Sequence, residues 1–375
     1  MRLALVADWL PTFGGAEHVV ASLGKIWPDA PLFTTVAKAD AVAAVGIADV
    51  RTSKLQTAYR IIGNHQILLP WMPRAIEAID LTGFDVVLSS SHAVGKGVIV
   101  PSSAVHICYC HTPMRYAWEM EDQYLDDFHL RGFLRKSVKK QLKHLRRWDL
   151  STAKRVDVFI ANSSETQERI ARIYGRDSTI VSPPVDDRFF ASPLQKNSDG
   201  SFLALGRLVP YKRFDLLIEL ANQLQIPLTI AGTGQDEARL KSLAGPTVQF
   251  LGFVSDDQLP SLYASSKALL FPQYEDAGIV PLEAQACGTP VIAYAKGGVM
   301  DTVVNGVTGI FAANQTVDDF AKAIETFGRK AWDHEVIRNH ARQFSEQKFQ
   351  IKMKEIVEES VKNIIKKQDR ITTNE

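Results

Sequence analysis

Cysteine is scarce in this chain, with three residues in 375: Cys108, Cys110 and Cys287. An odd and sparse set of thiols does not make a disulfide framework. Cys108 and Cys110 share one face of a predicted strand, and His111 is the only other metal-binding residue type beside them. Because a structural zinc ion takes four ligands, buried free thiols are a better interpretation than a metal site.

The chain also has almost no net charge, no long apolar run and no acidic metal-binding motif. The formal net charge is +1, which argues against a general nucleic-acid binder. No stretch is apolar for long enough to span a bilayer, and Met1–Asp8 lacks the apolar core and cleavage site of a signal peptide. These absences predict a cytoplasmic protein and leave attachment to a membrane surface open. There is no Asp-x-Asp, so a divalent metal ion has no obvious ligand set.

The length and the apolar content, 375 residues and 46%, are sufficient for two domains with substantial cores. Short β-rich runs alternate with amphipathic segments, which predicts an α/β protein with parallel sheets. The predicted strands of the first half are Arg2–Ala7, Phe84–Ser89, Val105–Tyr109 and Val156–Ala161. Those of the second half are Phe202–Gly206, Leu228–Ala231, Val248–Phe250, Ala268–Phe271 and Val291–Tyr294.

A domain boundary is predicted at Ser182–Asp186, because the prolines Pro183 and Pro184 continue neither a helix nor the interior of a strand. This gives two successive Rossmann-like domains, 1–183 and 184–347. The last helices are expected over about Asp318–Lys367, followed by a polar tail. In such a fold a ligand binds at the carboxyl ends of the strands.

Two cations directly follow a predicted strand, in Gly206-Arg207-Leu208-Val209-Pro210-Tyr211-Lys212. An arginine grips phosphate oxygens with two hydrogen bonds and a lysine adds a point charge. Arg207 and Lys212 are therefore predicted to bind a diphosphate, in place of a metal ion. The alternative is two solvated surface cations, the usual place of these residue types.

Two glutamates, Glu275 and Glu283, flank Gly278-Ile279-Val280, and a helix is predicted to begin near Pro281. The amides of that helix start are a ready anion site. Glu275 is expected to bind sugar hydroxyls and Glu283 the hydroxyls of a ribose. Together with the cations this inventory suits a site that holds a sugar, a diphosphate and a ribose. The alternative is that the two glutamates only stabilise the N-terminus of the helix by interacting with its dipole.

Glycines and histidines mark further turns. Gly14-Gly15 precede a predicted helix from about Ala16, and their amides are candidates for approaching a diphosphate. Gly232-Thr233-Gly234 lacks the third glycine of a dinucleotide fingerprint, so a nicotinamide site is not expected. His111 follows a strand and is a ligand candidate. Residues predicted to face an acceptor are His92, Arg115 and Trp118. For the turn that holds His92, a helix cap by Ser91 is an equally good interpretation.

The segment Phe133–Leu150 is strongly basic. Its apolar residues recur at helical spacing: Phe133, Val138, Leu142, Leu145 and Trp148. A basic amphipathic helix of this kind can lie on anionic lipid. Alternatively it packs on its own domain through the apolar stripe and exposes a solvated basic face.

Taken together, these motifs resemble family 4 of the retaining glycosyltransferases, over nearly the whole chain from Gly14-Gly15 to Ala286-Cys287-Gly288-Thr289-Pro290. The resemblance implies an α/β fold of the GT-B type, two Rossmann-like domains facing each other across a cleft. It also implies that the last helix, about 348–375, crosses back to the first domain. The donor-binding residues implied are Gly14, Gly15, Arg207, Lys212, Val254, Glu275, Gly278, Ile279, Val280 and Glu283.

The same resemblance implies the residue roles. Glu275 contacts the donor sugar, Glu283 the ribose, and Arg207 with Lys212 the diphosphate; His111 binds the sugar near the reacting carbon. The segment around Val254 lies by the base. No cofactor and no metal ion are expected.

The stretches Ser89–Gly97 and His106–Trp118 resemble a narrower group, bacterial enzymes of O-antigen and surface-polysaccharide synthesis. Many of these use GDP-mannose, which makes it the preferred donor, with a glycan or lipid-linked glycan as acceptor. The alternatives are a UDP-sugar transferase, a sugar-nucleotide epimerase, and a non-catalytic protein that binds nucleotide sugar. A phosphorylase would need pyridoxal phosphate on a lysine, for which the sequence gives no basis.

Overall fold

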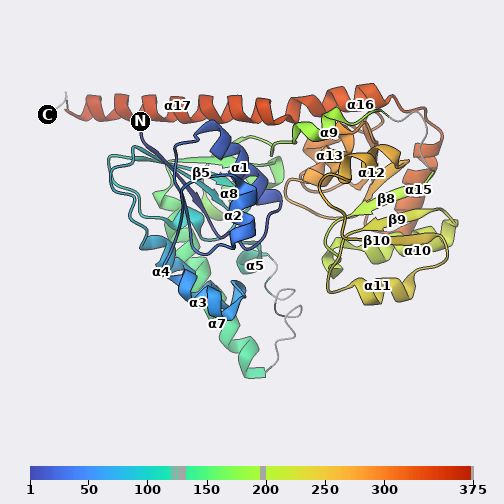
Figure 1. Ribbon diagram of the computed structural model, residues 1–375, viewed down its shortest axis with the longest axis horizontal. Helices are drawn as coiled ribbons and strands as arrows, with labels where there is room; N and C mark the ends of the chain where they lie inside the picture. Colours follow the sequence, from blue (N-terminus) through green and yellow to red (C-terminus); the bar gives the residue numbers. More distant parts are fainter. Residues whose placement is uncertain (120, 122–124, 126–131, 195–199, 373–375) are drawn as a thin grey trace. The chain divides into compact units, whose positions relative to one another are not determined.

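The computed structural model describes residues 1–119, 121, 125, 132–194 and 200–372. The chain forms two compact units (Figure 1). The N-terminal unit is Met1–Ser182 together with Phe349–Glu375, and the C-terminal unit is Pro183–Lys348. Pro183 and Pro184 lie where the chain passes from one unit to the other.

The N-terminal unit is built on a parallel sheet of seven strands in the order β3-β2-β1-β4-β5-β6-β7. The strands are β1 (Leu3–Ala7), β2 (Leu32–Thr34), β3 (Val50–Thr52), β4 (Val86–Ser91), β5 (Val105–Cys110), β6 (Val158–Ala161) and β7 (Ser178–Ile180). The three central strands β1, β4 and β5 are buried along their whole length. That explains their nearly continuous apolar sequences, because helices cover both faces of a parallel sheet.

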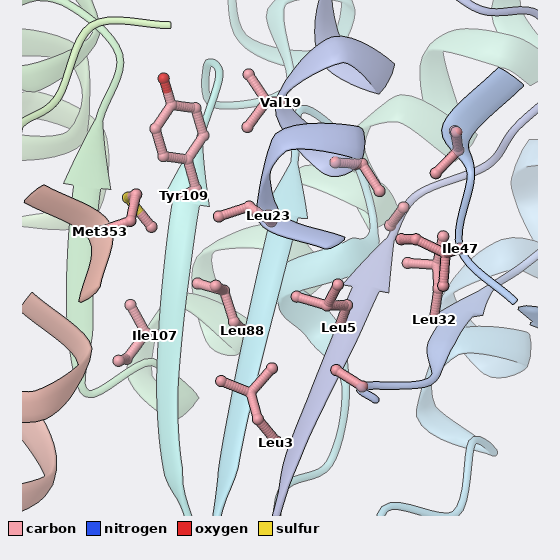
Figure 2. Packing of buried hydrophobic residues seen from close by; sticks show 14 of the residues in the cluster. Leu3, Leu5, Val19, Leu23, Leu32, Ile47, Leu88, Ile107, Tyr109 and Met353 are labelled. Atoms are coloured by element: carbon pink, nitrogen blue, oxygen red, sulfur yellow. The ribbon is translucent and has the colours of Figure 1, made fainter. Parts of the chain in front are cut away.

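Helices and short 3-10 turns connect these strands. They are α1 (Gly15–Ile26), α2 (Ala39–Val45), α3 (Leu55–Ile62), η1 (Gln66–Trp71), α4 (Met72–Glu77), η2 (Gly95–Gly97), α5 (Arg115–Trp118), α7 (Gly132–Thr152), η3 (Ala153–Arg155) and α8 (Ser164–Tyr174). On one face of the sheet Leu5 and Leu88 pack with Leu23 of α1 (Figure 2). Met353, from the last helix α17 (Glu346–Thr372), joins the same core. The predicted return of the C-terminal helix to the first domain is thus confirmed.

The C-terminal unit has its own parallel sheet, in the order β10-β9-β8-β11-β12-β13. Its strands are β8 (Phe202–Leu205), β9 (Leu228–Ala231), β10 (Val248–Gly252), β11 (Ala268–Phe271), β12 (Val291–Tyr294) and β13 (Gly309–Ala312). Its helices and 3-10 turns are α9 (Asp187–Ala191), η4 (Pro210–Lys212), α10 (Phe214–Leu224), α11 (Glu237–Leu243), α12 (Leu259–Ser265), α13 (Ile279–Ala286), α14 (Val299–Thr302), α15 (Val317–Gly328), α16 (His334–Ala341) and η5 (Arg342–Phe344). The prediction of an α/β protein with two parallel sheets is confirmed.

Several predicted boundaries are wrong. The strand predicted at Phe84–Ser89 is β4, which runs two residues further, to Ser91, because the serines pair in register with Tyr109 and Cys110 of β5. The short strands β2, β3 and β7 and the edge strand β13 are not among the predicted strands. The start predicted near Pro281 is confirmed, because helix α13 begins at Ile279 and has Pro281 in its first turn. The tail 373–375 lies outside the described residues.

The basic helix α7 packs on its own unit. Leu142 and Leu145 are buried in a core cluster with Met72 and Ile76 of α4, and Val138 and Trp148 pack against the same cluster. The apolar stripe is therefore occupied, as the second interpretation of this helix predicts; the side chain of Phe133 lies outside the description. The exposed basic residues of α7 include Lys136, Lys140, Lys143 and Arg147. Within the described parts of the chain, no helix combines the length and the apolar character needed to cross a membrane.

Candidate functional site

The loop after β8 holds its two cations very differently. Lys212 is 8% exposed, and its Nζ lies 2.9 Å from Glu275 Oε1. Gly206 leaves the space for this side chain, since a Cβ there would approach Lys212 Nζ to 3.0 Å. Arg207 is exposed, with its Nη2 3.5 Å from the hydroxyl of Tyr211. The interpretation as a solvated surface cation therefore fits Arg207 and not Lys212.

The two glutamates lie on either side of the start of α13. Gly278 caps this helix at φ +67°, a conformation that favours glycine. Glu275 precedes it and Glu283 is in its second turn, so neither carboxylate is in the first turn and the explanation by the helix dipole is wrong. Ile279 and Val280 open the helix, and with no side-chain cap their amides face outward from its end.

Glu283 is buried, and the hydroxyl of Tyr263 donates a 2.8 Å hydrogen bond to its Oε2. Burial raises the pKa of Glu283 to about 7, against the opposing effects of the Tyr263 hydrogen bond and the charge of Arg188. Carboxyl groups with a pKa raised to near neutrality occur more often in functional sites than on ordinary surfaces, and Tyr263 holds this one in a fixed orientation.

Two glycines outside the predicted site hold the Glu275 loop in place. A Cβ at Gly297 would lie 2.3 Å from the carbonyl oxygen of Glu275, and one at Gly298 would lie 2.3 Å from that of Asp276. The amide of Gly298 also donates a 3.0 Å hydrogen bond to the Glu275 carbonyl. The sequence signal is the pair Gly297-Gly298 itself, which follows β12 at the same sheet edge.

The turn Gly232-Thr233-Gly234 has a structural reason. A Cβ at Gly232 would lie 2.0 Å from the carbonyl oxygen of Gly206, and one at Gly234 would lie 2.2 Å from that of Leu208. These glycines therefore let the loop after β9 cross closely against the loop that carries Arg207 and Lys212. Val254, predicted near a base, is half-buried just after β10 and packs on the core of this unit.

In the N-terminal unit, His111 lies at the end of β5. Its Nε2 is 2.8 Å from Ser90 Oγ, and its carbonyl oxygen accepts hydrogen bonds from Asn162 and Thr166. Burial and the charge of His92 lower the pKa of His111 to about 3. The ring is consequently neutral at physiological pH and serves as a hydrogen-bonding group rather than a cation.

His92 is held by a carboxylate that sequence reasoning missed. Asp8, at the end of β1, is buried and accepts hydrogen bonds from the amides of His92 and Ala93 and from Ser91 Oγ. His92 Nδ1 lies 2.9 Å from Asp8 Oδ2. Burial acts to raise the pKa of Asp8, but the charge and hydrogen bonds of His92 outweigh it and lower that pKa to about 2. Ser91 thus bonds to Asp8 instead of capping a helix.

The remaining predicted residues lie in the same unit. Gly14 and Gly15 form the start of α1, and Gly14 is extended, so its backbone does not itself require glycine. Arg115 and Trp118 bound α5. The indole Nε1 of Trp118 donates to Asp149 Oδ2 at 2.7 Å, which gives this side chain a structural partner within its unit.

The structure thus brings Lys212 and Glu275 into contact in one unit, and His92 and His111 to 6.2 Å between ring centroids in the other. All three cysteines are buried free thiols, as predicted. Across the described ranges, no three His, Cys, Asp or Glu side chains are grouped so that they would hold a metal ion.

Comparisons with known proteins find a glycosyltransferase family model matching each unit. Residues 13–189 match the family model described as Glycosyltransferase Family 4. Residues 185–347 match the model described as Glycosyl transferases group 1. Each unit thus carries its own match to a glycosyltransferase family model, and the fold with its two Rossmann-like parallel sheets is of the GT-B type.

The curated relatives are partial matches. D-inositol 3-phosphate glycosyltransferase of Kribbella flavida is 32% identical over 220 residues, 48% of this chain and 52% of that protein. Mannosylfructose-phosphate synthase of Agrobacterium fabrum is 28% identical over 281 residues, 66% of this chain and 62% of that protein. The chain thus spans about half to three fifths of the length of these relatives.

Solved structures match along nearly the whole chain. HepE of Anabaena in complex with UDP is 19% identical with a TM-score of 0.69, and the match covers 96% of this chain and 100% of HepE. Sucrose-phosphate synthase of Thermosynechococcus elongatus is 16% identical with a TM-score of 0.71, covering 96% and 99%. At these identities the likeness shows the fold.

Proposed function

We propose that the protein is a retaining hexosyltransferase that moves a hexose from a nucleoside-diphosphate sugar to a glycan or lipid-linked glycan. The observation that carries this is the contact between Lys212 and Glu275 in the group 1 domain, where a cation and a carboxylate meet at the carboxyl ends of parallel strands. A diphosphate and a sugar ring need these two kinds of partner side by side.

In the proposed reaction the bond from the sugar to the diphosphate breaks, and negative charge builds on the leaving group. Lys212 and Arg207 stabilise that charge, helped by the amides that open α13. Glu275 binds hydroxyls of the hexose as it becomes oxocarbenium-like. The leaving phosphate takes the proton of the attacking hydroxyl, so no protein base is required and Glu275 is not assigned as a nucleophile.

The remaining candidate residues are assigned to the nucleotide, the sugar and the acceptor. Glu283 binds the ribose, and the segment around Val254 lies by the base. Gly14 and Gly15 leave room for the diphosphate, and His111 donates or accepts one hydrogen bond with the sugar. His92, Arg115 and Trp118 belong to the acceptor side, with Trp118 acting through its fixed indole.

GDP-mannose is the preferred donor, on the resemblance of Ser89–Gly97 and His106–Trp118 to enzymes of surface-polysaccharide synthesis. The name of the Agrobacterium relative, a mannosylfructose-phosphate synthase, favours mannose as well. The second candidate is a UDP-sugar donor, favoured by HepE, which was solved with UDP and with UDP-glucose. We also propose that transfer needs no metal ion, since Lys212 and Arg207 supply the positive charge.

We place the protein in the cytoplasm, peripheral to the inner face of the cell membrane. The exposed basic side chains of α7 support this, because anionic headgroups attract juxtaposed lysine and arginine. A lipid-linked acceptor would be met at that surface.

A donor screen tests the proposal. Purified protein is mixed with GDP-mannose and a panel of UDP-, GDP- and ADP-sugars, with lipid-linked glycan acceptors, in the presence of EDTA. We expect release of nucleoside diphosphate and a matching mass gain on the acceptor for one donor. Conversion of the donor without acceptor would indicate an epimerase. Binding without conversion across the panel would support a non-catalytic protein, and absence of binding would overturn the assignment of Arg207, Lys212 and Glu283.

A further inference from the structure

Four large apolar side chains within residues 61–71 of the N-terminal unit are exposed, and the proposed chemistry does not use them. They come from the end of α3 and from η1, which a short turn joins, and are Ile61, Ile62, Ile67 and Trp71. We call these four residues the apolar ridge. Ile61 is 83% exposed, Ile67 55% and Trp71 53%. Single exposed apolar residues are ordinary, but four within residues 61–71 are a local concentration of the kind that marks an interaction site.

The ridge is not an unfinished part of the core. The inner sides of the same elements are already buried: Tyr59 of α3, Leu68 and Leu69 of η1, and Met72 of α4 belong to one core cluster. Leu142 and Leu145 of α7 belong to that cluster too, so the ridge elements and α7 cover the same face of the sheet (Figure 1). The ridge is therefore an additional, outward apolar surface beside a basic helix.

The chain around the ridge has an excess of positive charge, although Asp49 and Glu77 flank it. Residues 50–76 include Arg51, Lys54, Arg60 and Arg74 and no acidic residue. Arg51 pairs with Asp49, while Arg60 and Arg74 are exposed. On α7, the exposed lysines and arginines described above add to this surface. A surface that combines exposed isoleucine and tryptophan with an excess of cations matches an anionic bilayer, which offers hydrocarbon beneath negative headgroups.

We propose that the apolar ridge inserts into the headgroup and upper acyl region of an anionic bilayer, while the basic face of α7 lies over the headgroups. Tryptophan is the residue type enriched at that depth, and the isoleucines reach the acyl boundary. This assigns the apolar contact to α3 and η1 rather than to the stripe of α7, which is buried in the protein.

The ridge adjoins the histidine cluster of the same unit. His65, in the turn between α3 and η1, lies 5.0 Å from the ring of Trp9, and Trp9 lies 5.0 Å from the ring of His92. A membrane docked on the ridge would hold a lipid-linked acceptor close to His92. This use of the docking rests on the proposed function, whereas the docking itself does not.

Vesicle binding tests the proposal without donor or acceptor. Full-length protein is sedimented with vesicles of pure phosphatidylcholine and with vesicles containing phosphatidylglycerol. The ridge variant Ile61→Ser/Ile67→Ser is compared with the control Ile99→Ser, because Ile99 is 55% exposed in the same unit and lies outside the ridge. Circular dichroism and the unfolding midpoint establish that each variant is folded.

We expect the wild-type protein to bind the anionic vesicles, the ridge variant to bind at least about tenfold more weakly, and the control to bind as the wild type does. Equal binding by the ridge variant would overturn the proposal, as would absence of wild-type binding. If light scattering instead shows a dimer that the ridge variant abolishes, the ridge is a contact between copies of this chain. Transfer to a water-soluble acceptor should be unchanged in the ridge variant, which separates this proposal from the proposed function.

Discussion

Lys212 and Glu275 balance each other's charge across 2.9 Å, in a place where Lys212 is almost fully shielded from water. A buried lysine without a partner would tend to lose its proton, since burial disfavours the charged form. Glu275 thus offsets the charge of Lys212 where water does not. In the proposed function the two groups serve one substrate, Lys212 its diphosphate and Glu275 its sugar hydroxyls.

Glu283 predicts a pH-dependent stability. The pKa of its carboxyl is raised by burial from 4.5 to about 7, so between these values the folded protein holds a proton that the unfolded chain releases. The free energy of unfolding should therefore fall as the pH rises through this window, by on the order of 3 kcal/mol. The variant Glu283→Gln should lack this component, which urea unfolding at pH 5 and pH 7 measures. Equal pH dependence in both proteins would contradict the assignment.

Gly297 predicts a backbone effect on the Glu275 loop. At Gly297→Ala the new Cβ would meet the Glu275 carbonyl at 2.3 Å, so the loop must shift. The matched control is Gly306→Ala, since Gly306 has a similar φ of +75° but its Cβ would meet only the flexible end of Lys330 at 3.8 Å. Both should lose about 1 kcal/mol of stability for the left-handed conformation, but only Gly297→Ala should also lose donor turnover, roughly tenfold or more. Equal turnover in the two variants would show that the loop position does not matter.

Candidate site residues can be predicted from the sequence where they stand in a recognisable motif. Residues whose role depends on contacts with distant parts of the chain are missed. Arg207, Lys212, Glu275 and Glu283 follow predicted strands or flank a predicted helix start. Asp8 is invisible by the same reasoning, because a single acid after a strand is common. Its role comes from donors in a single loop, residues 91–95, which lies more than eighty residues away in sequence, so no local pattern around Asp8 records them.

Helix α7 shows why an amphipathic pattern alone does not settle a helix's partner. Its apolar stripe is equally suited to lipid and to the protein core, and only the neighbouring α4 and β4–β5 region decide in favour of the core. A buried ion pair adds to this packing. Lys96 of η2 contacts Asp149 of α7, and Asp149 also accepts hydrogen bonds from Trp118 and Tyr174.

This ion pair predicts a large and specific loss of stability. Lys96→Met leaves the buried carboxylate of Asp149 without its cation, which should lower the free energy of unfolding by about 3 kcal/mol or more. Lys143→Met removes an exposed cation of α7 and should change stability by no more than about 0.5 kcal/mol. Urea denaturation of the two variants provides the comparison. A loss at Lys96 no larger than that at Lys143 would rule out a structural role for the pair.

The strands that the sequence misses are short and lie toward the sheet edges. β2, β3 and β7 have three residues each, and the side chains of β3 and β7 are largely exposed, so they carry no apolar run. Their pairing depends on the strand beside them. The long central strands, buried on both faces, are by contrast readable from composition alone.

At the scale of the whole molecule, two sheets with separate cores make two units. The last helix, α17, completes the core of the N-terminal unit. Residues Phe349, Met353 and Val357 of α17 are buried in the core of the N-terminal unit, although they follow the C-terminal unit in sequence. The stability of the first unit therefore depends on the end of the chain.

This dependence can be measured with two neighbouring residues of α17. Met353→Ala removes a fully buried side chain and should destabilise the N-terminal unit by about 2–5 kcal/mol. Ile351→Ala, on the exposed side of the same helix, should cost less than about 1 kcal/mol. Hydrogen exchange of the β1, β4 and β5 amides reports on this unit. Equal exchange in both variants would mean that α17 does not support the N-terminal sheet.

The central claim is that the C-terminal unit binds and activates a nucleotide sugar through Lys212 and Glu275. The most direct measurement compares nucleoside-diphosphate release and donor affinity for wild type, Glu275→Gln and the control Glu219→Gln, an exposed glutamate on α10. We predict that Glu275→Gln loses turnover on the order of a hundredfold, keeps donor affinity within about tenfold, and that the control matches the wild type. Wild-type turnover by Glu275→Gln would contradict the account.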